Sequence, residues 1–221
     1  MIKISNRLHK IFSKIAPYTS FCDVGCDHGY LEVLALQSSD YHILAVDNKE
    51  GPINSCKSNV KMYAKYTDNI EYSLSSGLDE LTPKYNCVTI CGMGTELICD
   101  IIQKNIDKTS YIDRFIIDSH RNISDLRVYM SKIGYGIVDE ELIYENDIYY
   151  EIITFEKSDK TYSDIEYYFG PLLLQNKNEV FYQKYNALLQ SKKLILSNIK
   201  DNNNPKYKQI ENEIKLIESV L

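Results

Sequence analysis

Aspartates and glycines gather at two places that each follow a predicted β-strand. Asp23, Gly25 and Gly29 form the pattern D-x-G-x-x-x-G after the apolar run TSFCDV, and Asp47 ends the next apolar run, YHILAVD. A glycine turn between a strand and a helix lets a ligand approach the backbone and leaves the helix N-terminus open to it. A carboxylate at the end of the second strand suits two ribose hydroxyls. These residues predict a site for a cofactor that contains a nucleoside.

Asp27 distinguishes two classes of cofactor. A dinucleotide-binding loop has the pattern G-x-G-x-x-G, and Asp27 stands where such a loop has its second glycine, beside a pyrophosphate. A carboxylate there repels phosphate and tolerates a cation. S-adenosylmethionine carries a sulfonium and an ammonium, so the loop favours this methyl donor. An NAD-dependent oxidoreductase is therefore disfavoured.

Two further turns complete the expected cofactor site. Ser75-Ser76-Gly77-Leu78 follows the third predicted strand and is expected to face the adenine, and Cys91-Gly92-Met93-Gly94 follows the fourth. The predicted cofactor contacts are Asp23, Gly25, Asp27, Gly29, Asp47, Asn48, Ser76, Gly77, Cys91, Gly92 and Met93. The six cysteines form no CxxC pair. We therefore expect buried thiols and no metal site.

Strands and helices alternate from about residue 18 to residue 157. Five strand–helix units predict a doubly wound α/β fold with a parallel sheet and right-handed crossovers. Two β-rich runs, 136–146 and 147–157, predict an antiparallel hairpin joined around Glu145-Asn146-Asp147. Class I S-adenosylmethionine methyltransferases, which are Rossmann-like, have a mostly parallel seven-stranded sheet with an antiparallel last strand. Dinucleotide-binding sheets usually continue with a sixth parallel strand, so the hairpin favours a methyltransferase.

The C-terminal part is expected to be an antiparallel helical hairpin. Residues 158–169 are polar and predict a linker, and a long helix is expected from about 172 to 200. The run 201–205 breaks this helix, and a second helix follows. Apolar spacing predicts a coiled-coil seam through Phe181, Tyr185, Leu188, Lys192, Ile195, Ile199, Ile210, Ile214, Ile217 and Leu221. The expected domains are 1–160 and 161–221.

The formal charge of −6 excludes a broadly basic nucleic-acid-binding protein but leaves room for local basic patches. Residues 1–20 carry four cations and no acid, and lysines gather on the C-terminal hairpin. We expect phosphate contacts from Arg7, Lys10, Lys14, Arg121, Lys192 and Lys193, with Arg127 as a further candidate. A solvated coiled-coil face is the alternative for the hairpin lysines. A membrane-spanning run and a signal peptide are both missing, which predicts a cytoplasmic protein.

Several motifs together resemble one known family. They are SNRL in the first helix, DVGCDHGYL, GP at the start of the helix after the second strand, SGL, ICGMG, DEELIYENDIYYEIITFEK and FGPLLLQNKNEVF. This series is similar to the TrmK family of bacterial tRNA (adenine-N1)-methyltransferases, which modify the adenosine at position 22 of tRNA. The resemblance runs from about Ser5 to the C-terminus. It implies a class I methyltransferase domain with a coiled-coil hairpin, S-adenosylmethionine as donor and tRNA as partner. Nothing in the sequence requires an obligate protein partner.

Transfer to N1 of adenine needs little acid–base chemistry. The neutral base has a free lone pair at N1, so alignment and exclusion of water matter more than a general base. Because N1 lies on the Watson–Crick edge, the nucleotide must leave its paired position to reach a pocket. The candidates for contacts at the reacting centre are Asp27, His28 and Tyr30, with Tyr149 or Tyr150 as a stacking partner.

The chain departs from the family pattern at four places. The usual GMGG ends in Thr95, and an acid common before the fourth strand is Asn86. The Asp of G-D-G-L is Ser76, and the Gln-Pro after the fifth strand is Asp118-Ser119, followed by His120. That last loop faces the target base in class I nucleic-acid methyltransferases. Two alternatives therefore stay open: methylation of another RNA base, or a non-catalytic RNA-binding module with a degenerate cofactor pocket. The sequence lacks an [ND]-P-P-[YF] motif, which argues against methylation of an exocyclic amino group.

Overall fold

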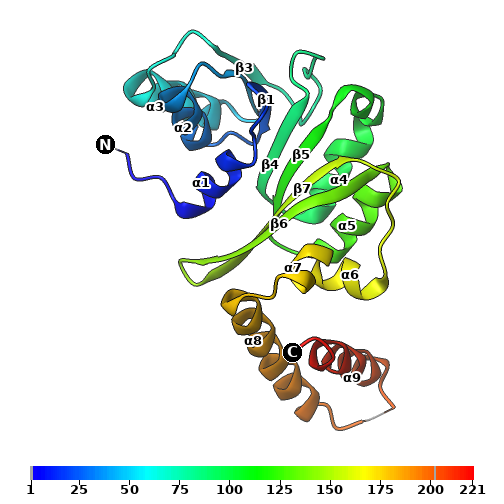
Figure 1. Ribbon diagram of the computed structural model, residues 1–221. Helices are drawn as coiled ribbons and strands as arrows, with labels where there is room; N and C mark the ends of the chain where they lie inside the picture. Colours follow the sequence, from blue (N-terminus) through cyan, green and yellow to red (C-terminus); the bar gives the residue numbers. More distant parts are fainter. Residues whose placement is uncertain (1, 202) are drawn as a thin grey trace.

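The computed structural model describes residues 2–201 and 203–221 and has a seven-stranded sheet at its centre (Figure 1). The strand order is β3-β2-β1-β4-β5-β7-β6, and β7 alone runs antiparallel to its neighbours β5 and β6. This is the predicted class I methyltransferase sheet. The strands are β1 Ser20–Val24, β2 His42–Asp47, β3 Ile70–Leu74, β4 Cys87–Met93, β5 Arg114–Ser119, β6 Tyr135–Glu145 and β7 Ile148–Lys157.

Helices cover both faces of the sheet because its central strands are apolar on both sides. Val88 and Ile90 of β4 share one core with the helices on one face, whereas Cys87 belongs to the core on the other face. The first face carries α4 Thr95–Lys104 and α5 Ile123–Lys132. A short 3-10 helix, η1 Ile106–Tyr111, follows α4 and leads into β5. The second face carries α1 Asn6–Ser13, α2 Tyr30–Ser38 and α3 Glu50–Tyr63.

The predicted β-hairpin is confirmed. Asn146 and Asp147 both have left-handed backbone conformations, with φ of 51° and 63°. This is the pattern of a two-residue turn whose twist matches that of the flanking strands. The long hairpin extends beyond the rest of the sheet toward the C-terminal helices (Figure 1).

The prediction of one long helix from about 172 to 200 is wrong. The structure divides it into α7 Pro171–Gln175 and α8 Glu179–Ser197, because the Asn178 side chain caps a new helix by accepting a hydrogen bond from the Phe181 N–H. The polar segment before it contains α6 Asp164–Phe169, which starts at a capping box. The second helix of the expected hairpin is α9 Pro205–Glu218. Asn202, within the predicted break, lies outside the described residues.

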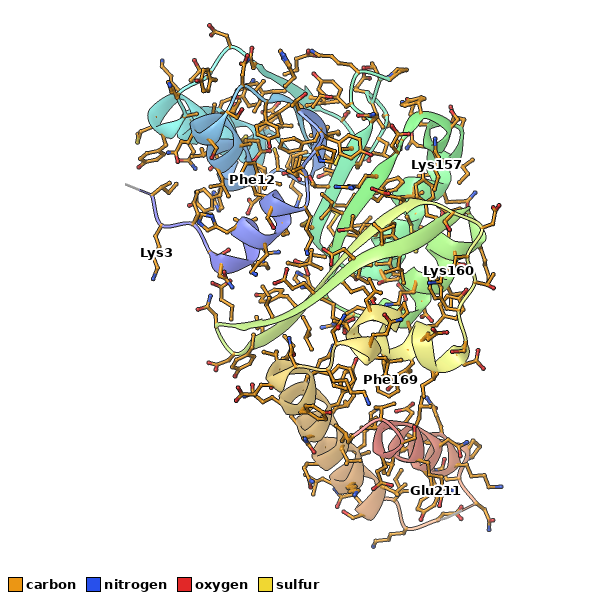
Figure 2. The ribbon with its side chains drawn as sticks, in the orientation of Figure 1. Lys3, Phe12, Lys157, Lys160, Phe169 and Glu211 are labelled. Atoms are coloured by element: carbon orange, nitrogen blue, oxygen red, sulfur yellow. The ribbon has the colours of Figure 1, made fainter. Side chains whose placement is uncertain are left out.

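A third core holds the helical hairpin together and joins it to the sheet. Phe169 lies between the sheet and α8 (Figure 2), with its ring centroid 4.8 Å from that of Tyr185, and Leu142 of β6 packs in the same core. The seam prediction is wrong at Ile195 and Leu221, which are 40% and 38% exposed. It is correct at the buried residues Phe181, Tyr185, Ile210, Ile214 and Ile217. The seam continues through Leu189 and Leu196 instead. A helix with 3.6 residues per turn drifts away from a strict heptad spacing.

A buried ion cluster connects the sheet to the C-terminal helices. The Arg127 side chain is completely buried, and its Nε lies 2.8 Å from Glu140 Oε1 and its Nη2 2.5 Å from Glu151 Oε2. Lys184 of α8 pairs with the other oxygen of Glu151, and Glu140 accepts a hydrogen bond from the Leu172 N–H. The expectation that Arg127 contacts phosphate is therefore wrong. Whether the chain divides into domains at residue 160 stays a prediction.

Candidate active site

Two adjoining cavities open where β1, β2 and β4 end. The larger has a volume of about 800 Å³ and the smaller about 480 Å³. Five residues line both cavities and form the wall between them: Gly25, Asp47, Asn48, Lys49 and Met93. The carboxyl edge of an α/β sheet is the usual place for a ligand. A ligand with two connected parts, one in each cavity, fits this arrangement.

The loop after β1 needs left-handed backbone conformations, and Gly25, Asp27 and Gly29 have φ of 85°, 45° and 69°. The Gly25 N–H donates to the Val46 carbonyl at 2.8 Å, which ties the loop to β2. Gly25 and Asp27 line the larger cavity, whereas Gly29 lines neither cavity. A Cβ on Gly29 would lie 2.9 Å from the Cys56 Cα, so this glycine allows the loop to pack against α3.

Asp47 stands at the wall between the two cavities. Its Oδ1 accepts a hydrogen bond of 3.0 Å from the Lys49 N–H, which holds the carboxylate in one orientation at the end of β2. Ser76 and Gly77 line the smaller cavity, as does Asp79, which the sequence analysis missed. The expected ribose and adenine contacts are thus brought together around one space.

Asp23 is the buried carboxylate of the site. It is 5% exposed, it lines the larger cavity, and the Thr89 hydroxyl donates a hydrogen bond to it. Burial raises its pKa. Asp27 is very different, because 68% of its side chain is exposed and its Oδ2 lies 3.7 Å from His28 Nε2. Water screens the field of an exposed carboxylate, so Asp23 is better placed than Asp27 to attract a cationic ligand.

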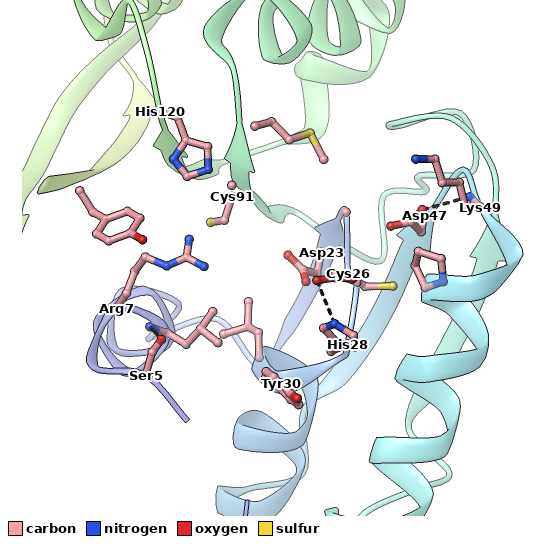
Figure 3. Close-up of a pocket in the computed structure, with 18 of the residues that line it drawn as sticks. Ser5, Arg7, Asp23, Cys26, His28, Tyr30, Asp47, Lys49, Cys91 and His120 are labelled. Carbon is pink, nitrogen blue, oxygen red and sulfur yellow. Dashed lines mark hydrogen bonds and ion pairs between the residues drawn. The ribbon is translucent and has the colours of Figure 1, made fainter. Parts of the chain in front are cut away.

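Arg7, Tyr150 and His120 form the opposite end of the larger cavity. The Arg7 guanidinium lies 5.1 Å from the centre of the Tyr150 ring, and its Nη1 is 2.5 Å from Oδ2 of the fully buried Asp118. The His120 and Tyr150 rings meet edge to face at 6.1 Å. Figure 3 shows Arg7 and His120 on the side away from Asp47. The sequence identified Arg7 only as a phosphate contact and gave no sign of its pairing with Asp118.

Two departures from the family pattern meet in space. The Thr95 and Ser119 hydroxyl oxygens are 2.8 Å apart and buried. Beside them β4 has a bulge between Cys91 and Met93, at which Gly92 has φ of 77°. Bulges often redirect side chains next to active sites. Here the bulge brings Met93 to the wall shared by the two cavities.

The predicted contacts at the reacting centre, Asp27, His28 and Tyr30, all line the larger cavity. The rings of His28 and Tyr30 stack with centroids 5.5 Å apart, and His28 Nδ1 lies 2.9 Å from the Ser55 hydroxyl. Of the two tyrosines considered for stacking, Tyr150 lines the cavity, whereas Tyr149 packs against the third core.

The predicted tRNA contacts are spread over the molecule, and all four of the predicted lysines form ion pairs. Lys10 lies 2.7 Å from Glu141, Lys14 pairs with Glu141 and Asp139, Lys192 lies 2.5 Å from Glu213 and Lys193 lies 2.7 Å from Glu218. Arg121 is exposed and follows the cavity residue His120. Lys3 and Lys49 also line the larger cavity, which the sequence analysis did not anticipate.

Residues 21–219 match the model of a family described as TrmK: tRNA (adenine(22)-N(1))-methyltransferase. The chain belongs to this family. It is 27% identical to the tRNA (adenine(22)-N(1))-methyltransferase of Bacillus subtilis, over all of this chain and 98% of that protein.

Two solved structures show how far the similarity extends in space. M. capricolum TrmK in complex with S-adenosyl-homocysteine is 30% identical, with a TM-score of 0.87 over 98% of this chain and 96% of that chain. Streptococcus pneumoniae Sp1610 in complex with S-adenosyl-L-methionine is 27% identical, with a TM-score of 0.91 over 99% and 100%. The TrmK family fold therefore includes both the sheet and the helical hairpin.

Proposed function

We propose that this TrmK-family chain transfers the methyl group of S-adenosylmethionine to N1 of an adenosine in tRNA, at position 22 as its relatives' names state. The match of residues 21–219 to the family carries the proposal. The site supports it, because it offers a nucleoside-sized cavity joined to a larger space with carboxylates and aromatic rings. The same proposal locates the protein in the cytoplasm with its tRNA substrate. Within the described residues, no helix is long and apolar enough to cross a membrane.

The residues of the two cavities fit the methyl donor. The proposed contacts are Ser76 and Gly77 for the adenine, Asp47 for the ribose hydroxyls, and Gly25 with Asp23 for the methionine part. A side chain on Gly25 would overlap the Met93 methyl group, so the glycine keeps the shared wall open. When bound, S-adenosylmethionine supplies an electrophilic methyl carbon on a positively charged sulfur. The buried Asp23 carboxylate supplies complementary charge on the protein side.

The end of the larger cavity at Arg7 is the proposed place for the adenine of tRNA. Tyr150 and His120 offer aromatic surfaces for stacking, and the Asp118 carboxylate fixes the Arg7 guanidinium beside them. These groups hold a flipped base and exclude water, which is sufficient for a nucleophile that has a free lone pair. The exposed cations Lys3 and Arg121 are the proposed phosphate contacts at this rim.

Methylation at C5 of a pyrimidine, an alternative acceptor, is disfavoured by Cys91. Such chemistry requires a thiolate as nucleophile. Burial raises the pKa of the Cys91 thiol well above its ordinary value, and the nearby Asp118 and Asp23 carboxylates raise it further. The thiol therefore stays protonated and is a packing residue.

The test is to map the modified base. Incubation with tRNA and methyl-labelled S-adenosylmethionine, followed by nuclease digestion and mass spectrometry, is expected to give 1-methyladenosine at position 22. The matched control is the same tRNA with guanosine at position 22, which should take up no label. Label on another base would refute the proposed acceptor. Binding of S-adenosylmethionine without any label in tRNA would support the non-catalytic RNA-binding module.

A further inference from the structure

Two cysteines and a glutamate from three different parts of the chain meet beside the loop after β1. They are Cys26 of that loop, Glu32 in the first turn of α2 and Cys56 of α3. Their ligand atoms, which are the two Sγ atoms and a carboxylate oxygen, all lie within 4.8 Å of one another. The spacing of the cysteines in the sequence predicted no metal site. The fold nevertheless assembles a set of side chains that can bind a metal ion.

Glu32 is a buried carboxyl group that the rest of the fold leaves without a partner. Its exposed fraction is 0%, and neither of its oxygens has a hydrogen-bond partner among the described residues. Burying a polar group without a partner is strongly unfavourable, and buried carboxylates are therefore usually paired with a cation or bound to a metal. Both oxygens of Glu32 are thus available to a cation within the cluster.

Close packing of the loop against α3 brings the two thiols to this carboxylate. A Cβ on Gly29 would lie 2.5 Å from the Cys56 Sγ, so the glycine is what lets the loop approach the helix. The Cys26 side chain points from the loop toward α3 (Figure 3). Cys56 is 0% exposed and Cys26 is 5% exposed. All three side chains are therefore shut off from solvent, as are the ligands of structural zinc sites.

We propose that Cys26, Glu32 and Cys56 bind a zinc ion that ties the loop after β1 to α2 and α3. The two thiolates supply two ligand atoms and a bidentate Glu32 carboxylate supplies two more, which gives the four ligands of a closed site. A tetrahedral ion with Zn–S bonds of about 2.3 Å holds its two sulfurs about 3.8 Å apart. Small side-chain adjustments within the cluster are sufficient to reach this geometry.

The donor set favours zinc over other common ions. Magnesium and calcium require six or more oxygen ligands, whereas two of the three side chains here offer sulfur. Copper(I) would use the two thiolates and leave the buried carboxylate without a partner. Each ligand binds zinc in its deprotonated form, so the thiol and carboxyl protons leave for solvent as the ion enters. Two thiolates, one carboxylate and Zn²⁺ carry one negative charge together, as a Cys₃His site does.

The ion acts on the shape of the cofactor site and takes no part in the transfer of the methyl group. Cys26 lines the larger cavity, as do its neighbours Gly25 and Asp27, whereas Glu32 and Cys56 line neither cavity. A bond from Cys26 to zinc fixes this loop relative to the two helices behind it. The inference therefore goes beyond the proposed function, and it can be tested without measuring methylation.

The experiment measures zinc in the untagged full-length protein, purified under reducing conditions so that Cys26 and Cys56 stay thiols. After dialysis, elemental mass spectrometry should find about one zinc ion per chain. Loss of an outer-shell partner already lowers metal affinity about 10–100-fold, so loss of a ligand should lower it at least about a hundredfold. We expect this loss in Cys56→Ser and in Glu32→Gln, measured by competition with a coloured chelator. Cobalt(II) in place of zinc should give a thiolate-to-metal absorption band that Cys56→Ser lacks.

Cys99→Ser is the matched control, because it removes a partly exposed thiol of α4 that lies outside the cluster. It should keep the zinc ion and the cobalt spectrum of the unmodified protein. An unmodified protein that retains no zinc would overturn the inference, as would equal zinc affinities for Cys56→Ser and Cys99→Ser. Zinc bound without methylation of tRNA would refute the proposed function alone.

Thermal denaturation of the unmodified protein tests the site if the cluster variants do not fold. An ion that binds the folded state stabilises it by mass action. A chelator should therefore lower the melting temperature, and zinc added in excess of the chelator should restore it. Cys99→Ser should respond in the same way. A melting temperature that is the same with and without the chelator would contradict a zinc ion in this cluster.

Discussion

Gly25 and Gly29 lie in the same loop and both have a left-handed backbone conformation, but they have different neighbours. Gly25 lines both cavities, whereas Gly29 touches the backbone of α3. We expect Gly29→Ala to lower the free energy of unfolding by about 1–3 kcal/mol, because the Cβ collides with Cys56 and φ is unfavourable. Denaturant unfolding measures this. Gly51→Ala in α3 is the control, since a Cβ there has no neighbour within 4 Å, and it should leave stability equal or higher.

Asp47 allows a test of the cofactor end alone. Asp47→Ala removes the proposed acceptor for the ribose hydroxyls, and hydrogen bonds to a charged group contribute about 1.5–3 kcal/mol each. We expect the dissociation constant for S-adenosylmethionine to rise at least tenfold in a titration without tRNA. Asp68→Ala changes an exposed aspartate outside both cavities and should bind normally. An unchanged affinity for Asp47→Ala would remove Asp47 from the site.

At the scale of elements, α1 and the β6–β7 hairpin are complementary in charge. The cations of α1, which suggested a phosphate-binding helix, instead meet Glu141 and Asp139 of β6, and Glu145 at the end of β6 accepts hydrogen bonds from the Asn6 and Arg7 N–H groups. These contacts hold α1 against the sheet as one wall of the larger cavity. Their main effect is therefore on the shape of the site.

The ion cluster around Glu151 predicts how acid affects the attachment of the C-terminal helices. Burial opposes ionisation of Glu151, but Lys184 and Arg127 outweigh it and lower its pKa. A lowered folded pKa gives stability that is present above the ordinary glutamate pKa, about 4.3, and is lost as pH falls through the folded value. Glu151→Gln should therefore be less stable than the unmodified protein at pH 7 by about 2–4 kcal/mol.

Urea unfolding at several pH values checks this expectation. The difference between Glu151→Gln and the unmodified protein should shrink as pH falls from 5 toward 3. Glu156→Gln is the control, because it removes a glutamate of the same strand that pairs with Arg114 and is partly exposed. If the free energies of unfolding of the two proteins differed by the same amount at every pH, Glu151 would not be ionised in the folded protein.

At the scale of the whole molecule, an acidic protein must bind a polyanion through local basic surfaces. The double change Lys192→Ala with Lys193→Ala should weaken tRNA binding and leave cofactor binding nearly unchanged, if these lysines contact phosphate. Measured in a gel-shift assay over a salt series, the slope of affinity against salt should fall by about 1–2 units. Unchanged affinity would assign the two lysines to the α8–α9 ion pairs alone.

A control separates these two roles of the lysines. Glu213→Gln with Glu218→Gln removes the partners and keeps both cations. If the lysines bind tRNA, this variant should bind at least as tightly as the unmodified protein. If they serve only to hold α9, both double variants should lose stability equally and neither should change the salt dependence.

Local sequence patterns were sufficient to predict the succession of strands and helices along the chain and the closing hairpin. They also predicted the glycine turns and the carboxylates at the ends of β1 and β2. Alternation, turn residues and strand-end positions are properties of neighbouring residues, so they can be read without knowing the fold. The family motifs extended the prediction to the methyl donor, S-adenosylmethionine, and to tRNA as the methyl acceptor. The break between α7 and α8 was missed, because a single capping asparagine outweighed a helical apolar spacing.

Tertiary structure alone decided the partners of charged groups. Arg7 meets Asp118, 111 positions further along the chain, and Arg127 meets Glu140 and Glu151, 13 and 24 positions further along. A cation in a sequence has the same side chain whether it is exposed or buried. Its role depends on the local dielectric and on which opposite charge the fold brings within about 4 Å. Those two quantities exist only once the sheet and its helices have packed.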